Sequence, residues 1–232
     1  MIKMRITIWF RKTLINEAVI KGLNSACSLL KLDVNFMIKG QSKPATIQVW
    51  DEIYNSFKPY EYTGIVNWIM NGESGQIKGK IYWPIHNPAN LPGSVQFDIS
   101  WENKKQTKGK GSSYVFDDVE LLLNFLHMLS ASVSADRLLV EPVKLPPDMI
   151  DLRYERFRKL TNNKTLTNID WIFGIRTSDK QSQDFKEIMN IIHKRTEVDG
   201  FVIYALTPNP LSYKSEEEIE FIKNIEEKIG LS

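Results

Sequence analysis

The part of the chain that most constrains the fold is residues 196–230. Residues 201–206 are all apolar or aromatic, and a run this short predicts a strand that is covered on both faces. The Thr-Pro-Asn-Pro segment that follows ends the strand, because proline has no backbone N–H to donate to a sheet. Ser215 and Glu218 then form a capping-box pattern at the start of an amphipathic helix, which Gly230 ends.

Other strands are predicted from alternating or β-branched sequences. Residues 2–10 and 94–101 alternate apolar with polar side chains, which indicates strands with one wet face. An Asn-Gly-Glu-Ser-Gly turn joins two further β-rich runs into a hairpin. The predicted strands are residues 2–10, 63–70, 76–83, 94–101, 138–143, 169–176 and 200–206.

Apolar residues at helical spacing predict the helices. The most apolar helix is residues 119–133, and we expect Asp117 with Glu120 to cap it. Ser42 begins a shorter helix that runs to about Phe57. The predicted helices are residues 14–31, 42–57, 119–133, 148–160, 184–194 and 215–230.

The mixture of helices and strands predicts an α+β fold, with an antiparallel-rich or mixed sheet that is covered by helices. We expect one domain over residues 1–232. Leu145-Pro146-Pro147 is the best internal boundary and would divide the chain into sub-halves 1–144 and 145–232, which leaves open two similar halves that share one sheet.

Charge and cysteine content exclude several classes of protein. The 30 basic and 28 acidic residues nearly cancel, which argues against a general nucleic-acid binder and against an acidic mimic of DNA. Cys27 is the only cysteine, so an internal disulfide is impossible. Residues 1–10 lack the pattern of a signal peptide, and no apolar run is long enough to cross a bilayer. We therefore expect a cytoplasmic protein with no membrane partner.

Residue patterns typical of catalysis are missing from the sequence. His86, His127 and His193 are far apart and belong to no metal-ligand motif. The carboxylate clusters lie where helix caps and helix dipoles favour acids. The glycine-rich segments lack the spacing of a phosphate loop, and no Gly-x-Ser-x-Gly sequence occurs. These observations predict a protein that is no enzyme and that needs no cofactor or metal.

The arrangement of several segments resembles the immunity protein 52 family of bacterial polymorphic-toxin systems. The C-terminal block carries most of the resemblance, with a glycine before an apolar strand, a proline-bearing turn and a helix that begins with polar and acidic residues. The Trp-bearing strand at 170–175 and the aromatic end of the first strand at 8–10 are also similar to the family. The matching segments of the C-terminal block are residues 199–204, 208–211 and 215–219.

This resemblance implies a cytoplasmic protein that binds a cognate protein toxin, a nuclease being one option, and blocks it by occluding its active site. It also implies a setting such as type VI secretion, no direct contact with nucleic acid, and no catalytic residues; a homodimer is left open. Loops that join strands often bind partners. We therefore expect the toxin to contact the proline-rich loop 84–92 and the acidic start of the last helix. The predicted contact residues are His86, Asn87, Asn90, Glu216, Glu217 and Glu218.

Two other classes of protein are kept as alternatives. An enzyme with a site assembled from scattered residues would show a deep pocket that holds His127 or His86 beside a carboxylate. A structural or adaptor protein of a phage or mobile element would show strong self-assembly without a toxin.

Overall fold

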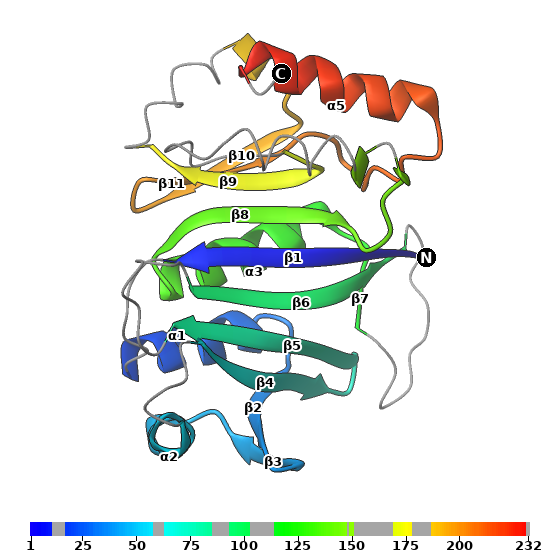
Figure 1. Ribbon diagram of the computed structural model, residues 1–232. Coiled ribbons are helices and arrows are strands. Elements are labelled where there is room, and N and C mark those ends of the chain that lie inside the picture. The colour runs from blue at the N-terminus through cyan, green and yellow to red at the C-terminus, as the bar shows by residue number, and fades with distance from the viewer. Residues whose placement is uncertain are drawn as a thin grey trace.

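A single sheet organises the whole chain in the computed structural model (Figure 1), which describes residues 1–10, 17–57, 63–84, 93–102, 114–147, 149–150, 169–177 and 187–230. Its eleven strands follow the order β10-β11-β9-β8-β1-β6-β5-β4-β2-β3, with β7 beside β6. All described pairs are antiparallel except β6 with β7, which is parallel. The strands are β1 (Ile2–Phe10), β2 (Asp33–Ile38), β3 (Gln41–Pro44), β4 (Thr63–Gly72), β5 (Gly75–Pro84), β6 (Gly93–Trp101), β7 (Val115–Phe116), β8 (Ala135–Pro142), β9 (Ile172–Arg176), β10 (Lys194–Val198) and β11 (Phe201–Ala205).

Four helices accompany the sheet in the described parts of the chain: α1 (Glu17–Ser28), α2 (Ile47–Ser56), α3 (Val119–Ser132) and α5 (Glu216–Lys228). Helices α1 and α3 pack together on one face of the sheet, whereas α5 lies beyond its β10 end (Figure 1). Mixed strand pairing with covering helices confirms the predicted α+β fold class.

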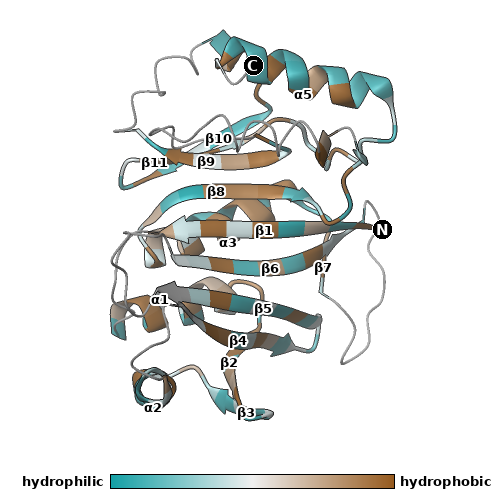
Figure 2. Cartoon of the chain, viewed as in Figure 1, coloured by the Kyte–Doolittle hydropathy of each residue, from teal (hydrophilic) through white to brown (hydrophobic). Residues whose placement is uncertain are grey.

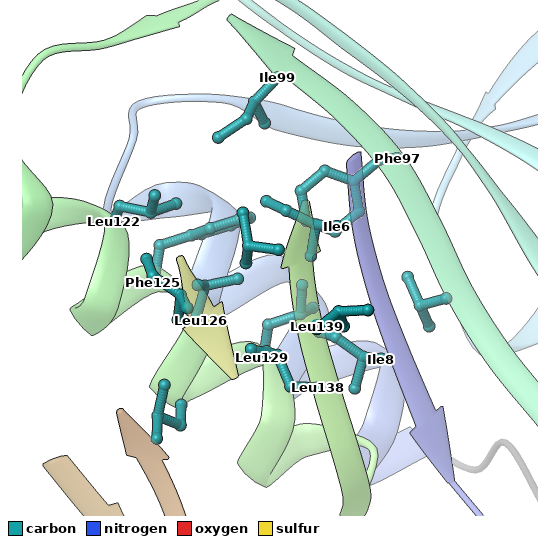
Figure 3. Close-up of a cluster of buried hydrophobic side chains, with 14 of the residues drawn as sticks. Ile6, Ile8, Phe97, Ile99, Leu122, Phe125, Leu126, Leu129, Leu138 and Leu139 are labelled. Carbon is teal, nitrogen blue, oxygen red and sulfur yellow. The ribbon is translucent and has the colours of Figure 1, made fainter. Parts of the chain in front are cut away.

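The apolar stripe of α3 forms the centre of the core. Phe125 and Leu126 are fully buried, and they face Ile6 of β1 and Phe97 of β6 (Figure 3). The rings of Phe97 and Phe125 meet edge to face, with their centroids 5.9 Å apart. An apolar helix against the alternating apolar side of two strands is the packing that the sequence predicts for residues 119–133.

The last strand is buried on both faces, as predicted. All five residues of β11 are buried, and so are the first four residues of β9. The helix that follows begins at the expected cap, where the Ser215 hydroxyl accepts a hydrogen bond from the Glu218 backbone N–H at 3.3 Å. It ends before Gly230, which has the positive φ of 72° that a helix terminus of this kind requires.

Two short hairpins were not predicted from the sequence. Residues 42–44 belong to β3, which pairs with β2 through the turn Lys39–Gly40, and the helix begins only at Ile47 with Thr46 as its cap. Strand β10 begins at Lys194, and the described residues before it form only a short 3₁₀ turn at 187–188, so the helix predicted for 184–194 is wrong in its described part.

The cap of α3 also differs from expectation. The α3 cap is Asp118 rather than Asp117, because the Asp118 carboxylate accepts the bond from the Glu120 backbone N–H at 2.8 Å. Most of the predicted helix 148–160 lies outside the described residues.

Candidate functional site

The predicted contact residues are divided between two parts of the chain. His86, Asn87 and Asn90 lie outside the described residues. Glu216 and Glu217 are exposed in the first turn of α5, where acids complement the helix dipole.

Glu218 is half-buried and is engaged within the chain. Its carboxylate accepts hydrogen bonds from the Ser212 backbone N–H at 3.3 Å, the Ser212 hydroxyl at 2.9 Å and the Lys214 backbone N–H at 3.1 Å. These bonds fasten the segment before α5 to the helix, so Glu218 has a structural role whether or not it also meets a partner.

The described histidines and the cysteine lie on different elements of the fold. His127 is half-buried on α3, where its Nδ1 lies 3.3 Å from the Thr196 hydroxyl, and His193 is exposed before β10. Cys27 is fully buried, and burial raises the pKa of its thiol to about 12, which opposes formation of the reactive thiolate. Within the described residues, no group of three or more His, Cys, Asp or Glu side chains is placed to hold a metal ion.

A large polar surface lies on the side of the sheet opposite α1 and α3. Figure 2 shows polar and apolar residues alternating along β1, β6 and β5, and the view looks onto the side of these strands that no described helix covers. We call this surface the open face, defined by the outward-facing residues Lys3, Arg5, Thr7, Trp9, Ile65, Asn67, Ile69, Lys78, Lys80, Tyr82, Gln96 and Asp98.

The open face is hollowed between the β2–β3 turn and β1. The hollow has a volume of about 830 Å³. Trp68 and Phe97 are 1% and 2% exposed because their side chains point into the core, so they contribute backbone to its floor. We call it the basic hollow, and its lining side chains include Arg5, Met37, Lys39, Asn67, Lys78, Lys80, Gln96 and Asp98.

The charges of the basic hollow are mostly positive, with four basic side chains against one carboxylate. Arg5 and Asp98 lie opposite each other on β1 and β6 and form a two-pronged ion pair, with Nε–Oδ1 at 2.9 Å and Nη2–Oδ2 at 3.2 Å. The Asp98 carboxylate raises the pKa of Arg5 further, against the opposing effect of burial. Lys78 and Lys80 are exposed and form no ion pair with a described residue.

Trp9 and Tyr82 form a band of aromatic side chains, the aromatic band, which borders the basic hollow toward the end of β1. The guanidinium carbon of Arg137 lies 4.2 Å from the centre of the Trp9 ring, a cation–π contact. Tyr82 is half-buried on β5, and Ile65 opposite it on β4 is 53% exposed. Trp, Tyr and Arg are the residues enriched in the energetically dominant parts of protein interfaces.

The sequence carries one signal for this surface. The polar members of the alternating strands, such as Lys78 and Lys80, mark the wet face of each strand separately. The open face presents cations and flat aromatic rings, which are kinds of side chain that protein interfaces use.

Comparisons with known proteins add a likeness in fold. No model of a known protein family matches the chain, and the comparison with curated protein sequences gives no match. Among solved structures, the chain is similar to the Pseudomonas aeruginosa T6SS protein PA0821, with a TM-score of 0.53 and 11% sequence identity. The match covers 97% of this chain and 72% of that protein.

This likeness shows a fold that is shared, distantly, with a protein of a type VI secretion system. The resemblance to the immunity protein 52 family stays a prediction. No helix in the described parts of the chain is both long and apolar enough to span a bilayer.

Proposed function

We propose that this protein neutralises a bacterial toxin of a type VI secretion system by binding it stoichiometrically and covering its active site. The observation that carries the proposal is the fold likeness to a T6SS protein, which extends over 97% of the chain. The resemblance to polymorphic-toxin immunity proteins in the C-terminal block supports the same function independently of that fold comparison.

The open face is the surface that suits this task best. Its side chains project from paired strands of one continuous sheet, so little backbone ordering is needed when a partner binds. Trp9 and Tyr82 supply large side chains with few rotatable bonds, and Arg137 lies over the Trp9 ring. A rigid surface of this kind blocks a cleft by excluding substrate, and this mechanism involves no bond-making step and no cofactor.

The experiment is co-expression with the toxin encoded beside this gene. We expect cells to survive, and we expect the two proteins to elute together as a stoichiometric complex in size-exclusion chromatography. Loss of protection, or separate elution of the two folded proteins, would contradict the proposed function.

The place of the interface is tested with matched aromatic variants. Trp9→Ala/Tyr82→Ala should weaken toxin binding by about tenfold to hundredfold, because both rings lie in the aromatic band. Tyr54→Ala removes an aromatic ring that is 40% exposed on α2, away from the open face, and should leave binding unchanged. Isothermal titration measures both, with thermal unfolding to verify that each variant is folded. Equal losses in the two variants would argue against this interface.

A further inference from the structure

The basic hollow brings three lysines together on the open face. Lys78 and Lys80 lie two residues apart on the same side of β5, which places their Cα atoms about 7 Å from each other. Lys39 lines the same hollow from the β2–β3 turn. Like charges this close repel each other and do not stabilise the folded chain.

Some lysines elsewhere on the described surface are paired with carboxylates. Three such pairs are Lys21–Glu17 and Lys43–Glu52, each at 2.8 Å, and Lys194–Glu120. In the basic hollow, the carboxylate of Asp98 is engaged by Arg5 through two hydrogen bonds. The lysines are therefore the positive charges that remain for a ligand.

We infer that the basic hollow receives an extended acidic segment of the protein partner, with carboxylates on alternate residues. In an extended chain, side chains two residues apart point the same way at a spacing of about 7 Å, which matches the spacing of Lys78 and Lys80. Each ammonium group then meets one carboxylate, and Asn67 and Gln96 beside the lysines supply amide groups for hydrogen bonds. This inference rests on the proposed function and specifies the chemistry of the partner.

An acidic protein segment fits the hollow better than a nucleic acid does. Proteins that bind single strands combine a basic groove with aromatic side chains on which the bases stack. The two aromatic residues that line this hollow, Trp68 and Phe97, are 1% and 2% exposed and point into the core, so neither offers a ring to a base. The aromatic residues Trp9 and Tyr82 lie at its border and are not part of its lining. The charge of the whole chain is also only +2, far from the strongly basic balance of a nucleic-acid binder.

The test uses the full chain and three fluorescent probes in anisotropy titrations at low salt. The first is a Glu-Ser alternating peptide, the second a peptide of the same composition with its glutamates in one block, and the third a single-stranded DNA of mixed sequence. We expect the alternating peptide to bind most tightly, and its affinity to fall as salt is raised.

Charge-reversal variants locate the binding. Lys78→Glu/Lys80→Glu should weaken binding of the alternating peptide by about tenfold or more, and Lys78→Gln/Lys80→Gln should weaken it less. Lys214→Glu/Lys223→Glu makes the same change of net charge at exposed lysines in and just before α5 and should leave the affinity unchanged. Thermal unfolding verifies that each variant is folded.

Three results would overturn the inference: no binding of the alternating peptide, equal loss in the α5 control, or tighter binding of the DNA than of either peptide. Because no toxin is present, these results are separate from the test of the proposed function. Toxin rescue without peptide binding would remove this inference alone, whereas peptide binding without rescue would remove the proposed function.

Discussion

The two ends of the sheet differ in how many of their faces are covered. Strands β9 and β11 carry consecutive buried residues, so both of their faces are dry. Strands β4, β5 and β6 alternate buried with more exposed residues, and their polar side forms the open face. Figure 2 shows the same difference, with β9 mostly hydrophobic and β5 and β6 mixed. One end of the sheet is therefore buried on both faces, and the other keeps one polar face in contact with solvent.

The largest test of this comparison is a pair of large-to-small substitutions. Phe173 is fully buried on β9 and stacks on Tyr204, with ring centroids 5.1 Å apart. Phe173→Ala should lower the free energy of unfolding by about 3–5 kcal/mol, because it removes a buried ring and leaves a cavity. Ile65→Ala on the open face should change it by less than about 0.5 kcal/mol. Urea denaturation measures both values, and similar losses would show that the two ends of the sheet are equally dry.

Sequence reasoning succeeded where one local pattern determined one element. The apolar run at 201–206 predicted a strand covered on both faces, and the alternation in residues 94–101 predicted one wet face, both as observed. It failed for β3 and β10, which lie at the two edges of the sheet and are short and polar. Such strands are held by pairing with a neighbour rather than by their own apolar pattern.

The open face was missed because its residues are distant in sequence. Arg5 and Asp98 are 93 residues apart and become neighbours only because β1 lies beside β6. The alternation in each strand predicts which residues point outward, but the strand order decides which of them share a surface. That order depends on long-range packing against α1 and α3, which no local pattern shows.

A smaller effect tests how closely side chains pack on the core side of β4, β5 and β6, which we call the open end of the sheet. A Cβ atom at Gly79 would lie 2.1 Å from the Trp68 Nε1 atom and 2.7 Å from the backbone oxygen of Gln96. Gly79→Ala should therefore lower the free energy of unfolding by about 1–3 kcal/mol, through displacement of the indole and of strand β6.

A double-mutant cycle separates these two causes. Trp68→Phe removes the indole nitrogen, which has no hydrogen-bond partner among the described residues, and opens space above Gly79. Gly79→Ala should cost less in the Trp68→Phe background than in the natural chain. Strictly additive losses would mean that the backbone of β6, rather than the indole, limits the space for a Cβ atom at Gly79. In that case the open end would be constrained by its strand spacing instead of its core packing.

The prediction with the smallest expected effect concerns the covered side of the open end. It tests whether water is excluded there as completely as from β9 and β11. Cys27 of α1 lies there, with its sulfur 3.0 Å from that of Met70 on β4, and burial raises its pKa from 9.0 to about 12. A raised pKa in the folded state means that the unfolded chain loses this proton first. The contribution of the protonated thiol to the free energy of unfolding is therefore fully present below pH 9.0. It is lost as the pH rises toward about 12.

At pH 10 this loss should amount to about 1.4 kcal/mol of unfolding free energy, and Cys27→Ala should remove it. Urea denaturation at pH 7.5 and pH 10 gives the change within each protein, and subtracting the two changes cancels the tyrosines that titrate in both. If the natural chain and Cys27→Ala lost stability equally between these two pH values, water would reach the thiol. The α1 side of the open end would then be wetter than the doubly covered end, and the difference between the two ends would extend through both faces of the sheet.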